Sequence, residues 1–193
     1  MNTNRKWTGM EIAVIGMAAK FPGANNIDEF WQNLVHGVES ISFFSDEELL
    51  ENGISAGILN NKNYIKARGI LKNPEFFDYP FFGYSRRMAE IMDTQSRLMH
   101  ECCYSALNDA CYIPEEYIGS IGLFIGASSN LQWQAMTLLE QMSGNDTVLG
   151  FESTQLVDKD EINLRISYNL NLRGPSIFLK TACSTSLTAV HIA

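Results

Sequence analysis

Short apolar runs and longer helical patterns alternate along the chain. Three runs predict buried strands at Glu11–Met17, Ser120–Ala127 and Ser176–Lys180. A helical pattern follows each of them. Because strands that alternate with helices pack side by side, we predict an α/β fold with layered helices on a mostly parallel sheet.

Local start and stop signals mark the first two helices. Asparagines ending at Asn26 precede the pattern IDEFWQNLV, and Gly37 follows it. Ser45 and Glu48 have the spacing of a capping box, which predicts a short acidic helix that ends at Gly53.

The second half of the chain carries the stronger helical patterns. The segment DTQSRLMHECCYSALNDA has apolar or small residues three and four apart, with Asp93 or Thr94 as its cap. A helix is also expected over residues 131–142. A capped helix beginning near Asp158 precedes the breaker at residues 173–175, and a last helix follows the third strand.

The stretch from Asn52 to Pro80 is rich in asparagine, glycine and aromatic residues, so we predict an irregular insertion. A group of aromatic rings lies in and just after it, and it suits either a ligand cage or core packing. We favour core packing for these rings, which belong to Phe76, Phe77, Phe81 and Phe82.

Composition restricts the possible partners. With 193 residues, 46% of them hydrophobic, the chain can form one sizeable core; we expect a polar leader at 1–10 and one domain at 11–193. A net charge of -8 opposes binding to nucleic acid or to anionic lipid. The longest apolar run, Ile12–Ala19, is far short of the roughly 20 residues that cross a bilayer. We expect a cytoplasmic protein without a membrane or nucleic-acid partner.

The cysteines and histidines predict no metal site. The four cysteines contain no C-x-x-C pair, and only three histidines are scattered along the chain. We interpret Cys102, Cys103 and Cys111 as reduced, packed thiols.

Two glycine-bearing turns resemble nucleotide-binding loops only superficially. After the first strand, Ala18 and Phe21 occupy the second and third glycine positions of the dinucleotide fingerprint. Gly119, Gly122 and Gly126 have the wrong spacing as well. We therefore predict no nucleotide site.

Cys183 is the candidate nucleophile. It lies in TACSTSL, where the third strand meets the last helix. Amide N–H groups and the positive end of a helix dipole stabilise a thiolate and a developing oxyanion there. A small buried hydrophobe is the alternative reading, and this pattern alone leaves both open.

None of the histidines is a convincing base for this cysteine. His191 is eight residues farther on, which is about 12 Å along a helix, whereas proton transfer needs a contact of about 3 Å. His36 and His100 are expected in other helices as packed or surface residues.

Four segments resemble the β-ketoacyl synthase domains of modular polyketide synthases. EIAVIGMAAKFPGANNIDEFWQNLVHG is similar to their opening, and MDTQSRLMHECCYSALNDA to their Asp-x-Gln-x-Arg-Leu helix. GLFIGASS resembles the next strand. RISYNLNLRGPSIFLKTACSTSL is similar to the stretch that carries their active-site cysteine.

The resemblance implies a thiolase-like fold, in which two α/β halves stack as five layers and this chain supplies the N-terminal half. Cys183 would accept an acyl chain from the phosphopantetheine arm of an acyl carrier protein. It would then give that chain to a carbanion made by decarboxylating a malonyl unit. No cofactor would bind the chain directly, and the expected partners are the carrier protein, the C-terminal half and a second copy in a homodimer.

The departures from the family pattern affect activity. The family's two catalytic histidines, one in a His-Gly-Thr-Gly-Thr motif, belong to the second half, so we expect no condensation from these 193 residues alone. Thr185 stands where serine is usual, Thr94 where proline is usual, and residues 100–103 replace bulkier aliphatics. The alternatives are a non-catalytic remnant that contributes dimerisation or carrier docking and, more weakly, a cysteine hydrolase.

Overall fold

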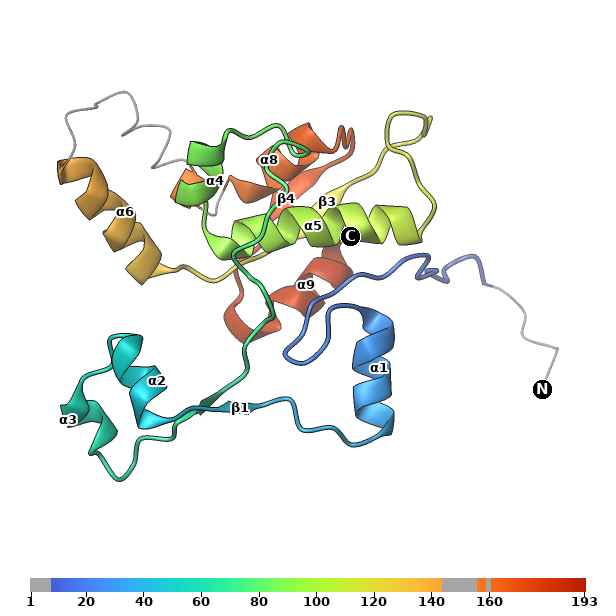
Figure 1. Cartoon of the computed structure of the whole chain (residues 1–193). Helices are drawn as coiled ribbons and strands as arrows, with labels where there is room; N and C mark the ends of the chain where they lie inside the picture. Colours follow the sequence, from blue (N-terminus) through green and yellow to red (C-terminus); the bar gives the residue numbers. More distant parts are fainter. Residues whose placement is uncertain (1–7, 144–155, 159–160) are drawn as a thin grey trace. The chain divides into compact units, whose positions relative to one another are not determined.

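The computed structural model describes residues 8–143, 156–158 and 161–193. The chain divides into two compact units, which are described separately (Figure 1). Ala19–Phe76 forms the smaller unit, and the residues up to Ala18 join Phe77–Ala193 in the larger unit. No helix in the described ranges has the length and apolar character needed to cross a membrane.

The smaller unit contains short elements that local signals begin and end. In order, they are α1 (Ile27–Val35), β1 (Ser42–Phe43), α2 (Asp46–Glu51), α3 (Ala56–Leu59) and β2 (Ala67–Arg68). Asn26 caps α1 by accepting a hydrogen bond from the Glu29 N–H, and Ser45 and Glu48 form the predicted capping box of α2. The antiparallel β1–β2 pair and α3 lie in stretches for which no regular structure was predicted.

The larger unit contains a two-stranded parallel sheet and longer helices. Its elements are α4 (Arg86–Ile91), α5 (Thr94–Asp109), β3 (Leu123–Ile125), α6 (Leu131–Ser143), α8 (Ile162–Asn169), β4 (Ser176–Phe178), a 3₁₀ turn η1 (Ala182–Ser184) and α9 (Thr185–Ile192). Asp93 caps α5, as predicted, because its Oδ1 accepts a hydrogen bond of 2.7 Å from the Gln95 N–H. Parallel pairing of β3 with β4 confirms the predicted strand direction.

The core of the larger unit lies where α5 and α8 meet the β3–β4 sheet (Figure 1). Ile162 and Ile166 of α8 are almost completely buried. On the same helix, Asn163 and Ser167 each donate a hydrogen bond of 3.0 Å to Ser176 Oγ. These contacts hold α8 against the first residue of β4.

The predicted strand at Glu11–Met17 is wrong for this structure. The segment is irregular, and Ile12 is 87% exposed. The segment lies alongside α5 instead. The Met17 N–H donates to Asp109 Oδ2, and a Cβ at Gly16 would lie 2.6 Å from the Ala106 carbonyl oxygen. A strand requires a neighbouring ladder, and none of the described strands pairs with this segment.

The sheet and one helix are shorter than predicted. Each strand of the parallel pair spans three residues, so the larger unit is a set of helices with a small sheet rather than layers on a large one. The helix expected from near Asp158 begins at Ile162, where Glu161 provides no side-chain cap.

Core packing is confirmed for only two of the four predicted aromatic residues. Phe77 and Phe82 stack with their ring centroids 5.1 Å apart in the larger unit. In contrast, Phe81 is 55% exposed, although its ring meets Tyr104 edge-on. Phe76, in the smaller unit, is 66% exposed.

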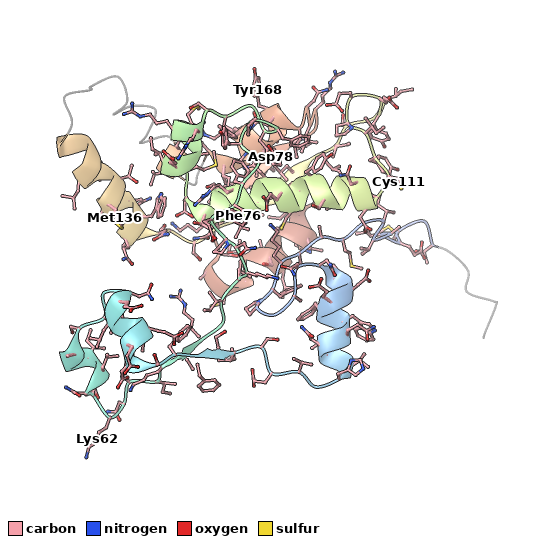
Figure 2. The ribbon with its side chains drawn as sticks, viewed as in Figure 1. Lys62, Phe76, Asp78, Cys111, Met136 and Tyr168 are labelled. Atoms are coloured by element: carbon pink, nitrogen blue, oxygen red, sulfur yellow. The ribbon has the colours of Figure 1, made fainter. Side chains whose placement is uncertain are left out.

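The prediction of packed thiols is wrong for Cys111. Cys102 and Cys103 are free thiols that are partly covered on α5, and burial together with the neighbouring Cys102 raises the pKa of Cys103 to about 12. Cys111 is exposed just past the end of α5, with a φ of 58° (Figure 2). This left-handed residue lies just after the helix C-cap, and its thiol is exposed.

Candidate active site

The turn between β4 and α9 carries Cys183. After β4, the chain passes through Thr181 into the 3₁₀ turn, and α9 begins at Thr185. Cys183 lies in the middle of that turn as an exposed free thiol. The structure therefore places this cysteine at the start of a helix and on the surface of the larger unit.

Ala182 gives the turn its direction. Its φ is 53°, in the left-handed region that residues with a Cβ rarely adopt. This conformation costs an alanine roughly 1–2 kcal/mol. Surrounding contacts must therefore hold the residue that immediately precedes Cys183.

Four hydroxyl-bearing residues supply those contacts, and we call them the hydroxyl cluster: Thr181, Ser184, Thr185 and Thr188. The Thr185 hydroxyl accepts a hydrogen bond of 3.0 Å from the Thr181 N–H and donates one of 2.8 Å to the Ala182 carbonyl oxygen. Ser184 Oγ donates to the Thr181 carbonyl at 2.8 Å, and the Thr181 and Thr188 hydroxyls lie 3.1 Å apart.

Gly126 permits the first residue of α9 to approach the end of β3. A Cβ at Gly126 would lie 2.2 Å from Thr185 Cγ2 and 2.3 Å from the Leu179 carbonyl oxygen. Gly174 has a similar role, because a Cβ there would lie 2.5 Å from the Gly122 nitrogen. These glycines allow close backbone packing.

Polar side chains outside the turn tie it to neighbouring elements. Lys180 Nζ donates a hydrogen bond of 2.9 Å to Ser129 Oγ in the loop after β3. In the same loop, the Ser128 N–H donates to Gln95 Oε1 of α5 at 3.3 Å. No local pattern in the sequence predicts these links, because they join residues that are tens of positions apart.

The backbone N–H of Cys183 is not bonded to the turn that surrounds it. Within the described part of the chain, no atom accepts a hydrogen bond from it, whereas the Ser184 N–H bonds to the Thr181 carbonyl oxygen. An unoccupied amide beside a thiol is a donor for an oxyanion that forms on a group attached to the sulfur.

Two of the three histidines lie on the surface of their units. His191 is exposed in the last turn of α9, the helix that follows Cys183. His36 is exposed at the end of α1, with its Nδ1 2.8 Å from the Gln32 carbonyl oxygen.

His100 is fully buried in the larger unit. Its Nδ1–H donates to the Ser96 carbonyl oxygen at 2.8 Å, so Nε2 accepts a hydrogen bond of 3.0 Å from the Tyr84 hydroxyl. Burial, with a smaller contribution from the Arg165 charge, lowers the pKa of His100 to about 4. His100 is thus a neutral core residue, which is the first of the two predicted alternatives, packed or surface.

Known proteins with similar sequences identify the family. Residues 10–193 match the N-terminal domain of beta-ketoacyl synthases. The chain belongs to the beta-ketoacyl synthase family. Its fold is accordingly that of a thiolase-like ketosynthase N-terminal domain, and the predicted polyketide synthase ketosynthase relationship is confirmed.

Curated relatives of this ketosynthase chain are much longer proteins. It is 42% identical over 188 residues to one component of the phenolphthiocerol/phthiocerol polyketide synthase of Mycobacterium tuberculosis, covering 94% of this chain and 13% of that protein. It is 35% identical over 180 residues to polyketide synthase PksN of Bacillus subtilis, covering 93% of this chain and 3% of that protein.

Solved ketosynthases of Bacillus amyloliquefaciens have the same fold. Ketosynthase twelve of the bacillaene polyketide synthase superposes with a TM-score of 0.80 at 33% identity, covering 94% of this chain and 31% of that one. The ketosynthase from module 1 of the bacillaene synthase gives a TM-score of 0.76 at 38% identity, with the same coverage.

Proposed function

We propose that this ketosynthase chain carries the acyl-accepting nucleophile of polyketide chain extension, and that the nucleophile is Cys183. One observation carries the assignment: Cys183 is an exposed thiol at the β4–α9 turn, and no described atom accepts a hydrogen bond from its backbone N–H. The thiol also lies immediately before the N-terminal, positive end of α9.

In the loading step, the Cys183 thiolate attacks the thioester carbonyl carbon of an acyl chain carried on the phosphopantetheine arm of an acyl carrier protein. The Sγ–carbon bond forms while the carbonyl π electrons move onto oxygen, and the Cys183 N–H donates to that oxyanion. The carbonyl then re-forms, the bond to the pantetheine sulfur breaks, and the departing thiolate takes a proton from water.

Chain extension needs groups beyond these 193 residues. A malonyl unit on a carrier loses CO₂, and the resulting carbanion attacks the acyl carbonyl on Cys183 Sγ, which leaves as a thiolate. The family assigns the decarboxylation to two histidines, one in a His-Gly-Thr-Gly-Thr motif that does not occur in this sequence. We propose that a C-terminal ketosynthase half supplies both of them.

The complete assembly follows from the same proposal. Two α/β halves form the five-layered thiolase-like fold, and two copies form a homodimer. The acyl carrier protein brings phosphopantetheine to Cys183, and the chain itself binds no cofactor. The site of action is the cytoplasm.

Intact-mass measurement after incubation with acetyl-pantetheine tests the assignment. We expect one acetyl group on the wild-type chain and on Cys111→Ala, and none on Cys183→Ala. Adding malonyl-carrier protein to the chain alone should give no ketoacyl product, because each missing acid–base group typically contributes about 10² to 10⁴ in rate. Equal acetylation of Cys183→Ala and wild type would overturn the assignment.

The same experiment separates the alternatives. A chain that binds carrier protein but never becomes acetylated is a non-catalytic docking module. Catalytic release of free acetate identifies a hydrolase.

A further inference from the structure

We propose that Thr185 is a positioning residue for Cys183. Its hydroxyl holds Ala182 in the left-handed conformation that directs the nucleophile and its backbone N–H outward. This inference rests on the proposed role of Cys183 as the acyl acceptor, and it assigns a function to the position at which the sequence departs from the family's usual serine.

The Thr185 hydroxyl spans the residue that needs support. It accepts a hydrogen bond from the Thr181 N–H at 3.0 Å, before Ala182, and donates to the Ala182 carbonyl oxygen at 2.8 Å. The Thr185 backbone N–H also donates to the Ala182 carbonyl oxygen. Thr185 therefore holds the Lys180–Thr181 peptide group, before Ala182, and the Ala182–Cys183 peptide group, after it.

This arrangement restrains the backbone torsions between those two peptide groups, which decide where Cys183 lies. Ala182 has a φ of 53°, and its carbonyl belongs to the peptide unit whose nitrogen is the Cys183 N–H. Rotation of that unit would turn the N–H away from the position of the oxyanion. Holding the Ala182 carbonyl with two donors therefore also holds the Cys183 amide.

The methyl group of Thr185 has a separate role. Its Cγ2 packs over Gly126 at the end of β3, where no Cβ could fit. The hydroxyl controls the turn, and the methyl positions α9 on the strand. Two substitutions separate these roles, because valine keeps the branched shape without the hydroxyl and serine keeps the hydroxyl without the methyl.

The experiment compares two reactions of Cys183 in the full chain: acetylation by acetyl-pantetheine and alkylation by iodoacetamide. Acetylation passes through an oxyanion, whereas alkylation does not. Because one oxyanion donor typically contributes about 10² to 10³ in rate, we expect Thr185→Val to slow acetylation at least tenfold and to change alkylation less than threefold. Thr185→Ser should keep both rates within about threefold of wild type.

Two controls keep the result interpretable. Ser186→Ala removes an exposed hydroxyl of α9 that lies outside the hydroxyl cluster, so its acetylation rate should stay within about threefold of wild type. In the double variant Ala182→Gly/Thr185→Val, glycine adopts positive φ without the Cβ cost, and acetylation should recover. If Thr185→Val lowers the helical circular dichroism, recovery of acetylation in the double variant still distinguishes a positioning role from a packing role.

The outcomes distinguish the inference from the function on which it rests. Unacetylated wild-type Cys183 contradicts the proposed function. Acetylated wild type with an equally fast Thr185→Val overturns the positioning role alone. Equal slowing of both reactions, equal loss in Thr185→Ser, or no recovery in the double variant would assign Thr185 a packing role instead.

Discussion

Among single residues, Cys183 differs from the other three cysteines in its surroundings. Cys102 and Cys103 are partly covered on α5, while Cys111 is exposed just beyond the C-terminal end of that helix. Cys183 is exposed at a helix start, beside the positive end of the α9 dipole.

This difference predicts the order of alkylation. With limiting iodoacetamide, we expect Cys183 to react first, Cys111 next, and Cys103 last, because the pKa of Cys103 is raised to about 12. Peptide mass mapping of partially labelled chain measures the order. Equal labelling of Cys183 and Cys111 would remove the case for an activated nucleophile.

His100 makes the stability of the larger unit depend on pH. Its pKa is about 4 in the folded chain and about 6.5 in a free histidine. Below pH 6.5 the unfolded chain therefore binds a proton that the folded chain excludes, so stability falls as the pH falls. Integrated from pH 7 to pH 4, the loss is about 3 kcal/mol.

Urea unfolding followed by tryptophan fluorescence at pH 7, 6 and 5 checks this prediction. The pKa of Glu11 is lowered to about 2 by hydrogen bonds led by that from the Thr8 N–H, so Glu11 titrates below this window. His100→Gln should lose stability at pH 7 but show a much flatter dependence on pH. His36→Gln, which alters an exposed ring, should retain the wild-type slope.

The single-residue features of the site were only partly predictable. The pattern around Cys183 is local, so the strand-to-helix turn could be read from the sequence. The left-handed Ala182 and the Thr185 bridge could not, because a φ of 53° at alanine follows from contacts and not from its own preference. The hydrogen bond from Lys180 to Ser129 could not be predicted either, because the two residues are 51 positions apart.

Among elements, the contact of α9 with β3 depends on Gly126. Replacing Gly126 with alanine places a Cβ 2.3 Å from the Leu179 carbonyl oxygen, a backbone atom that cannot easily move. We expect a destabilisation of about 1–3 kcal/mol, typical of overpacking. The same substitution at Gly57, within α3, should be neutral or stabilising, because the nearest atom to the new Cβ would be Ser55 Oγ at 4.0 Å. Chemical denaturation of both variants measures the difference, and equal stability would contradict the close packing.

We expect the outer edge of β4 to be the seam of the proposed homodimer. The Leu179 N–H and the Pro175 carbonyl both form hydrogen bonds on the β3 side. Along a strand, the backbone groups of successive residues point to opposite edges, so the Phe178 N–H faces the edge away from β3. Phe178→Pro should therefore abolish dimerisation of a complete ketosynthase while the β3–β4 pair persists. Ile177→Pro removes an N–H on the β3 side and should instead destabilise the sheet. Sedimentation velocity checks the assembly, and an unchanged Phe178→Pro dimer would exclude this seam.

Elements with local signals could be predicted, and elements that depend on distant partners could not. Ser45 and Glu48 bond to each other's backbone within one turn, so the sequence contains the whole of that helix start. The apolar, β-branched segment Glu11–Met17 looked equally clear. Whether it forms a strand depends on a neighbouring strand to pair with, however. In this structure it lies alongside α5, to which the Met17 N–H is bonded through Asp109.

Across the whole molecule, large apolar side chains remain uncovered. On α9, Leu187 is 78% exposed and Val190 is 72% exposed, and the segment near the start of the larger unit exposes Ile12 and Val14 as well. Isolated exposed side chains are ordinary, but contiguous apolar patches of more than a few hundred Å² are uncommon on monomers and favour association.

We therefore expect the purified chain to bind a hydrophobic dye and to associate with itself. Because Leu187 and Val190 lie three residues apart on α9, they share one face of the helix. The double variant Leu187→Gln/Val190→Gln should lower both dye fluorescence and the apparent mass in light scattering. Ser186→Gln, an exposed substitution of similar size on the same helix, should change neither. A wild-type chain that is a dye-negative monomer with a sharp thermal transition would show that these side chains need no partner, and would contradict the proposal that a second ketosynthase half completes the fold.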